Sequence, residues 1–235
     1  MRPRMRPPRR GPGRRLIIDD ELSSAIAAFW LARERGTQST THDRVFLALL
    51  QRELGEHGWP AEISTFAGSP RTIVSGHFRP AKSWDIVARD GAGAVRICVE
   101  FKSQVDSYGN NENNRYEEAL GSGLDARARH GPTLRMGFVL VLCEEPATQR
   151  FTRDRVPDVD PAFVGTSHVQ RRELFARRIV DFAISNMPFY NASAVLFVQR
   201  DGTFRSPDDP DLDIHTFVDR LVGDMGETLG PNTSS

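Results

Sequence analysis

The sequence predicts a mixed α/β fold in which α-helices flank one central mixed β-sheet. The expected elements follow one another as helix, helix, a hairpin of strands, helix, strand, helix and strand, an order typical of layered α/β domains. The most apolar run, residues 135–143, is typical of a strand buried on both faces. Of the 235 residues, 39% are hydrophobic, which suits a single domain with a sizeable core.

The N-terminal part predicts two amphipathic helices. The first begins at Asp19, has acids in its first turn and ends before Gly36; the second begins near Thr41 and ends at 58–60, a Gly-Trp-Pro sequence. Their apolar faces follow helical spacing and comprise Leu22, Ile26, Phe29 and Trp30 in the first, and Val45, Phe46, Leu49, Leu50 and Leu54 in the second.

Three strands are expected next, at residues 71–74, 84–88 and 95–101. Residues 90–93, Asp-Gly-Ala-Gly, join the last two strands with the composition of a hairpin turn. A phosphate-binding glycine loop would lead from a strand into a helix, and these glycines do not, so that interpretation is excluded.

The remaining chain predicts a polar loop at 103–114, a helix at 115–128 and the strand at 135–143. A long Pro- and charge-rich connection, 144–167, precedes a helix at 170–185, a strand at 192–199, a turn at 201–202 and a helix at 213–222. We expect a single domain at 16–225, a disordered Arg- and Pro-rich tail at 1–15 and a frayed end at 226–235.

The net charge of zero conceals an asymmetry. Seven arginines and no acids stand in residues 1–15, which leaves 24 basic and 31 acidic residues, a net charge of −7, in the rest. Any nucleic-acid contact by the domain therefore needs local positive charge. No run approaches the ~18–20 apolar residues of a membrane span. Cys98 and Cys143 lie in apolar runs, so we expect them to be buried, reduced thiols. This predicts a cytoplasmic protein.

Lysine is scarce. Of the 31 basic residues only Lys82 and Lys102 are lysines, and the other 29 are arginines. A position that keeps lysine in such a chain is a candidate for needing a compact ammonium group, although chance survival of two lysines explains the count equally well.

Asp85, Glu100 and Lys102 form the candidate catalytic group. Glu100 and Lys102 are two residues apart on one strand and so share a face, while Phe101 points to the other face. In a hairpin symmetric about residues 92–93, Asp85 lies opposite Glu100, where paired Cβ atoms are ~4.5–5.5 Å apart. The alternative is an ordinary surface ion pair on an edge hairpin.

Two carboxylates this close favour a bound divalent cation. Mg²⁺ takes oxygen ligands, and Asp85, Glu100 and the backbone carbonyl of Phe101 could supply them. Lys102 would position or deprotonate the attacking water, or stabilise charge on the phosphate; the sequence does not separate these roles. Glu53, beside the apolar face of the second helix, is either an accessory acid or a solvated helix residue.

The polar segment after Lys102 is suited to reading DNA. Asparagine pairs with adenine and arginine with guanine in the major groove. An Asn-rich turn that caps the next helix is an equally good interpretation. The candidate DNA-contacting residues are Gln104, Asn110, Asn111, Asn113, Asn114 and Arg115.

Two segments, FRPAKSWDIV and VEFKSQVDSYGNNENNRYEEALG, resemble the XhoI family of type II restriction endonucleases. The resemblance implies the restriction-endonuclease-like fold, whose signature is PD-(D/E)xK, with Asp85, Glu100 and Lys102 at the signature positions. Trp84 stands where the general signature has proline, as it does in the family. In the shared segment Arg79 and Lys82 either contact phosphate or are solvated charges.

The resemblance also implies Mg²⁺-dependent hydrolysis of both DNA strands at CTCGAG, leaving 5′-phosphates. A palindromic target implies a two-fold symmetric homodimer, and a restriction system implies a cognate DNA methyltransferase as genetic partner. Two alternatives remain: a structure-specific repair or recombination nuclease of the same fold, and a DNA-binding module without catalysis.

Overall fold

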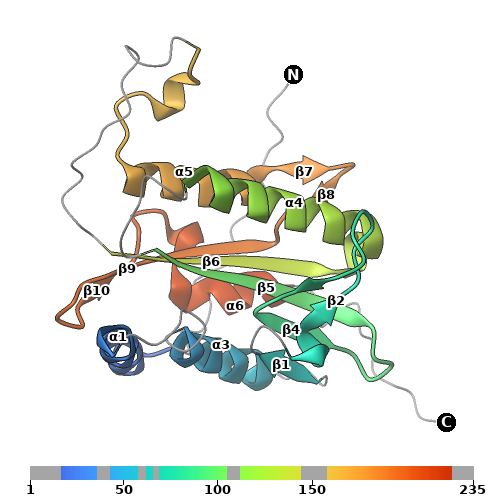
Figure 1. The fold of residues 1–235 in the computed structure, drawn as a ribbon, viewed down its shortest axis with the longest axis horizontal. Helices are drawn as coiled ribbons and strands as arrows, with labels where there is room; N and C mark the ends of the chain where they lie inside the picture. The colour runs from blue at the N-terminus through green and yellow to red at the C-terminus, as the bar shows by residue number, and fades with distance from the viewer. Residues whose placement is uncertain are drawn as a thin grey trace.

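The structure, a computed structural model, describes residues 17–35, 43–57, 62–65, 69–104, 112–143 and 158–223. The predicted tail at 1–15 and the predicted frayed end at 226–235 lie outside these residues. The expected class is confirmed: helices pack on both faces of one central mixed sheet (Figure 1).

The central sheet has six strands in the order β1-β4-β5-β6-β9-β10. β5 pairs with β6, and β6 with β9, in parallel, whereas the other pairs are antiparallel. β6 lies at the centre of the parallel part and is almost wholly buried, as its apolar sequence predicts. The strands are β1 (Ile63–Thr65), β4 (Ile86–Arg89), β5 (Val95–Gln104), β6 (Arg135–Cys143), β9 (Ala192–Val198) and β10 (Phe204–Arg205).

The two faces of the sheet carry different helices. α4 (Glu112–His130) and α5 (His168–Asp181), each preceding a parallel strand, cover one face (Figure 1). α1 (Asp19–Glu34), α3 (Arg44–Glu56) and α6 (Phe217–Val222) cover the other. Each face has its own cluster of buried apolar side chains. These two cores hold β5 firmly between the layers, which matters because β5 carries Glu100 and Lys102.

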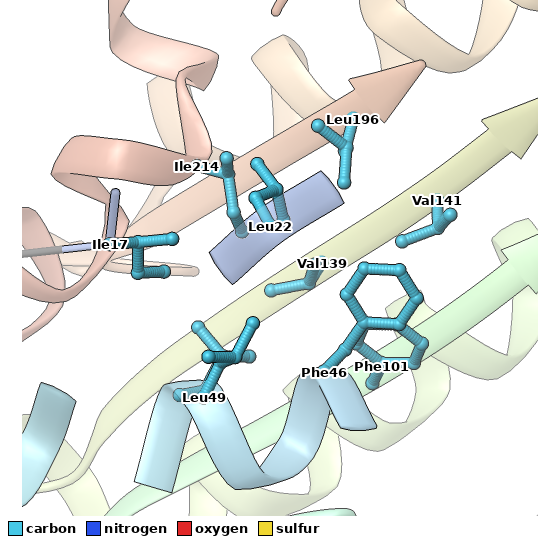
Figure 2. Close-up of a pocket in the computed structure, with 10 residues that line it drawn as sticks. Ile17, Leu22, Phe46, Leu49, Phe101, Val139, Val141, Leu196 and Ile214 are labelled. Carbon is cyan, nitrogen blue, oxygen red and sulfur yellow. The ribbon is translucent and has the colours of Figure 1, made fainter. Parts of the chain in front are cut away.

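Among the described residues, those that line the space between α1, α3 and the sheet are all apolar (Figure 2). Phe46 of α3 and Phe101 of β5 stack there with ring centroids 5.5 Å apart. An apolar interior of this kind is typical of packing between layers and offers no polar group to a ligand.

The hairpin of β4 and β5 has the predicted register. Ile86 pairs with Val99, Val87 with Cys98 and Ala88 with Ile97, with an irregularity at Arg89. The turn forms because Asp90 Oδ1 accepts hydrogen bonds from the amides of residues 92 and 94, and Gly93 adopts a φ of 81° that suits glycine.

Several predicted boundaries are wrong. Residues 71–74 do not form one strand of the central sheet: a 3₁₀ turn, η1 (Pro70–Thr72), leads into β2 (Ile73–Val74), which pairs with β3 (Lys82–Ser83) in a separate small sheet. β4 begins at residue 86, not at 84, and β5 continues to residue 104 because residues 101–104 still pair with β6.

The helix expected at 115–128 begins at 112 and ends at 130. The helix expected at 170–185 runs over 168–181, because a Ser167–Gln170 capping box starts it and extended Phe182 ends it. Residues 213–222 form η6 (Ile214–Thr216) and then α6, and the strands β1 and β10 were not predicted. The other short elements are η2 (Gly131–Thr133), η4 (Pro161–Phe163), β7 (Ala183–Ile184), β8 (Met187–Pro188) and η5 (Pro210–Leu212).

Within the described ranges, no helix combines the length and the apolar character needed to cross a bilayer.

Candidate active site

Asp85 lies immediately before the first residue of β4, where β5 extends beyond the pairing with β4. Its backbone N–H donates to the carbonyl of Val99 at 3.1 Å, and its Oδ2 accepts from the amide of Phe101 at 2.8 Å. These contacts go to the residues on either side of Glu100, so Asp85 is fixed to the edge of β5 beside that carboxylate. The neighbouring Trp84, 1% exposed, anchors the segment in the α4-side core.

Glu100 and Lys102 share the face of β5 that α4 covers, and Phe101 packs on the opposite face, as predicted from strand alternation. Val87 and Cys98 pair and both belong to the α4-side core. Asp85 and Glu100 lie two residues beyond them, which brings the two carboxylates close together at this end of the hairpin.

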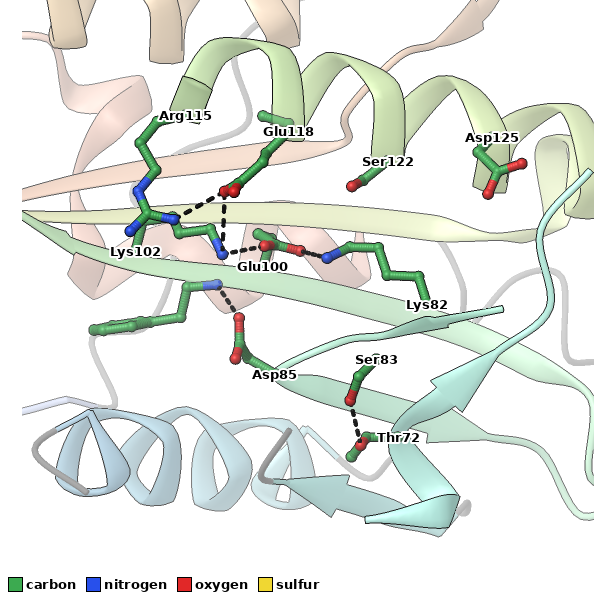
Figure 3. A network of polar contacts seen from close by, with 12 residues as sticks. Thr72, Lys82, Ser83, Asp85, Glu100, Lys102, Arg115, Glu118, Ser122 and Asp125 are labelled. Carbon is green, nitrogen blue, oxygen red and sulfur yellow. Dashed lines mark hydrogen bonds and ion pairs between the residues drawn. The ribbon is translucent and has the colours of Figure 1, made fainter. Parts of the chain in front are cut away.

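Glu100 is 2% exposed and is held by two ammonium groups (Figure 3). Lys102 Nζ forms a close ion pair with Glu100 Oε1 and lies 3.9 Å from Glu118 Oε2 of α4. Lys82 Nζ, from β3, lies 2.7 Å from Glu100 Oε2 and 5.1 Å from the centre of the Trp84 ring. The chain's only two lysines therefore meet on one carboxylate, and Lys82, a candidate DNA-binding residue from the sequence, contacts the candidate catalytic group.

Burial and charge act on these groups in different directions. Burial raises the pKa of Glu100, but the ammonium groups of Lys102 and Lys82 outweigh burial, and the net pKa is lowered. The pKa of Asp85 is raised, first by burial and then by the negative charge of Glu100. Burial lowers the pKa of Lys102, but Glu100 and Asp85 outweigh it, so the net pKa is raised. Lys102 is therefore an ammonium ion at neutral pH.

The residues fit a hard divalent cation. Glu100 Oε2 is buried and, despite its ion pair with Lys82, has no hydrogen bond of good geometry within the described part of the chain. Asp85 adds a second carboxylate whose charge Glu100 opposes. The carbonyl of Phe101 lies on the same edge of β5 as its amide, which faces Asp85. These oxygens are of the kind that Mg²⁺ binds together with waters and phosphate. No three acidic, histidine or cysteine side chains gather as a ready metal group among the described residues.

Asp43 is a site residue that the sequence reasoning missed. It precedes α3 directly and is hydrogen-bonded to Ser103 of β5, with Asp85 and Lys102 close enough to affect it. Burial raises its pKa to about 6, and its Oδ1 is buried without a hydrogen-bond partner in the described chain. The signal available in the sequence was only an acid before an amphipathic helix, which is typical of helix starts in general.

Arg79 makes protein contacts. Its Nε donates to Asp125 Oδ2 at 2.8 Å and its Nη2 to Ser122 Oγ at 3.1 Å, both on α4. Asp125 Oδ1 also accepts from the amides of His77 and Phe78. The carboxylate thus ties residues 77–79 to α4, and this arrangement favours a structural role for Arg79 over phosphate contact.

The proposed reading segment is only partly described. Asn110 and Asn111 lie outside the described residues, whereas Asn113 and Asn114 are exposed in the first turn of α4. Arg115 Nη1 donates to Glu118 Oε2 at 2.9 Å, which places Arg115 next to Lys102 through a shared acid (Figure 3). Gln104, at 8% exposure, presents little surface to DNA.

Glu53 is not brought to this cluster. It is 1% exposed, accepts from Arg52 Nη2 at 2.9 Å and lines a small hollow with His57, His215 and Asp219. Its partners therefore favour a structural ion pair, and the acid near the cluster is Asp43, the residue before α3.

A mixed sheet with Asp85 directly before one strand and Glu100-Phe101-Lys102 on the next defines the class of restriction-endonuclease-like proteins. The family model described as restriction endonuclease XhoI matches residues 46–206, which is more than half of the chain. The chain belongs to the XhoI restriction endonuclease family.

Curated relatives agree with this assignment. The chain is 35% identical over 147 residues to the type II restriction enzyme XhoI of Xanthomonas vasicola, covering 57% of this chain and 58% of that protein. It is 34% identical over 128 residues to the type II restriction enzyme BstVI of Geobacillus stearothermophilus, covering 48% and 56%. The matches thus span little more than half the length of these relatives, and no solved structure matches the chain significantly.

Proposed function

We propose that this protein is a type II restriction endonuclease that hydrolyses both strands of DNA in a Mg²⁺-dependent reaction and leaves 5′-phosphates. The observation that carries the proposal is the buried Glu100, with Lys102 on one oxygen and Asp85 at the same strand edge. Membership of the XhoI family and relatives named as type II restriction enzymes support the same activity.

Asp85, Glu100 and the Phe101 carbonyl are the groups that would hold Mg²⁺. The ion would lower the pKa of a bound water and neutralise charge on the scissile phosphate. Lys102 Nζ forms an ion pair with Glu100 Oε1 on the same strand. There it would orient the attacking water, stabilise negative charge on the phosphate or accept the water's proton.

The target we propose is CTCGAG, the sequence implied by the family. Asn110, Asn111, Asn113, Asn114 and Arg115 are the proposed base- and backbone-contacting groups. A palindromic target calls for two copies of the chain related by a two-fold axis, so we propose a homodimer. A cytoplasmic location and a cognate DNA methyltransferase complete the proposal; Cys98 and Cys143, buried and not joined in a disulfide, suit a reducing compartment.

The test is digestion of a sequenced plasmid by the full-length protein with Mg²⁺, followed by mapping of the DNA ends. We expect discrete fragments with 5′-phosphates at CTCGAG and none in EDTA. Discrete fragments at another sequence would keep the activity and refute the target. Cutting only at branched or single-stranded junctions would indicate a structure-specific nuclease, and binding without cutting would indicate a DNA-binding module.

A further inference from the structure

Lys82 is held in place by more contacts than a solvated surface lysine makes. Its side chain is 18% exposed, and its ammonium lies between the Trp84 ring and Glu100 Oε2. The β2–β3 pair fixes its backbone, with Val74 opposite Lys82. The tie between Asp125 and residues 77–79 holds the segment that leads into β3.

The site thus has two single positive charges on one carboxylate, one for each oxygen. Lys102 occupies Oε1 and Lys82 occupies Oε2. Mg²⁺ binds oxygen at about 2.0–2.1 Å and demands nearly octahedral geometry. Its double charge would repel an ammonium that lies 2.7 Å from the same oxygen, so metal binding at Oε2 favours movement of Lys82 away from it.

Lysine is the residue suited to such a displacement. Its compact ammonium is carried on a flexible four-carbon stem, whereas a guanidinium is planar and binds carboxylates through a rigid fork. At 29 other basic positions this chain has arginine, and the two lysines are both found on Glu100.

We propose that Lys82 is a placeholder for the metal: it holds Glu100 Oε2 charged and oriented in the metal-free protein and leaves when the metal binds there. The ammonium so released supplies positive charge beside the metal for the DNA phosphate. Lys82 is then a positioning residue that acts through Glu100. The inference rests on the proposed function, since it assumes that Glu100 is a metal ligand.

The experiment is titration of full-length protein with Mn²⁺, without DNA, by calorimetry. The variants are Lys82→Met, which keeps an apolar stem on Trp84, and Lys82→Arg, which keeps the charge. Arg96→Met is the matched control, because Arg96 also forms a 2.7 Å ion pair with an acid of the same hairpin, Asp90. Circular dichroism shows whether each variant is folded.

Lys82→Met should bind Mn²⁺ about tenfold more tightly than the wild type, since a close counter-ion changes a carboxylate's affinity for a proton by about that factor or more. Lys82→Arg and the control should show no such gain. Without metal, Lys82→Met should melt at a lower temperature, and Mn²⁺ should raise its melting temperature by more than that of the wild type.

Equal or weaker Mn²⁺ binding by folded Lys82→Met would overturn the proposal, as would the absence of Mn²⁺ binding in both proteins. If Lys82→Met did not fold, Lys82→Arg would decide, because it keeps the charge that competes with the metal. Unchanged Mn²⁺ binding by Lys82→Arg would support the proposal, and tighter binding would overturn it. Failure of the proposed function would appear differently, as wild-type protein that binds Mn²⁺ but does not cut DNA.

Discussion

Asp43 provides a quantitative test of the electrostatics around the site. Burial raises its pKa from 3.8 to about 6. A group with a higher pKa in the folded than in the unfolded protein binds more protons when folded, so the free energy of unfolding falls as the pH rises from about 4 to about 6 and stays lower above that range. Asp43 thus destabilises the protein at neutral pH.

The substitution Asp43→Asn should remove this cost. A difference of about two pH units corresponds to about 3 kcal/mol at full ionisation. We therefore expect the variant to exceed the wild type in free energy of unfolding by about 0.5 kcal/mol at pH 4 and by about 3 kcal/mol at pH 8. Asp43 makes no capping side-chain hydrogen bond to α3, so the change to asparagine removes no capping bond.

The assay is urea unfolding in EDTA, followed by tryptophan fluorescence from pH 4 to 8. Asp213→Asn is the control of opposite sign. Although burial raises the pKa of Asp213, its hydrogen bonds with His215 and Ser206 outweigh burial and lower the pKa to about 2, so this variant should lose stability at neutral pH. An Asp43→Asn gain that is absent, or equal at every pH, would show that burial does not raise the pKa of Asp43.

Three further predictions concern the surroundings of the site. Arg115→Ala should weaken binding to CTCGAG by ~1–3 kcal/mol if Arg115 makes a good base contact; equal losses on cognate and unrelated DNA in Ca²⁺ would show that it contacts only the backbone. Asp125→Asn removes the charge that Arg79 and two amides share, and should lower the free energy of unfolding by about 2–4 kcal/mol; a loss below 0.5 kcal/mol in urea unfolding, about the size of a typical surface change, would mean that the tie is weak. Glu53→Gln should leave the rate of DNA cleavage by folded protein unchanged, because Glu53 pairs with Arg52 away from the cluster; a large fall in rate without a fall in stability would restore its accessory role.

The sequence was sufficient for those parts of the site that depend on local geometry. Glu100 and Lys102 share a face because strands alternate, and a tight turn between two strands fixes their register. The same reasoning placed Phe101 in the opposite core. These relations need only the hairpin and the period of a strand, both of which can be read from about twenty residues.

Relations between distant segments could not be read in this way. Lys82 reaches Glu100 because β3 pairs with β2 and because Asp125, on a helix that follows both strands, holds residues 77–79. Asp43 meets Ser103 only because α3 packs across β5. The ends of α4 and α5 were misplaced for a similar reason: caps and the chain after them, which the apolar pattern does not encode, set where each helix stops.

Asp85, Glu100 and Lys102 form the proposed DNA-cleaving centre. The most direct test of this role compares wild-type protein with Lys102→Met on a DNA fragment that carries one CTCGAG site. Cleavage is measured in Mg²⁺ and binding in Ca²⁺. We predict that the variant folds and binds the fragment but cuts it at least about a hundredfold more slowly, the loss typical of removing one charge-stabilising group. Cleavage by Lys102→Met at the wild-type rate would show that Lys102 takes no part in cleavage.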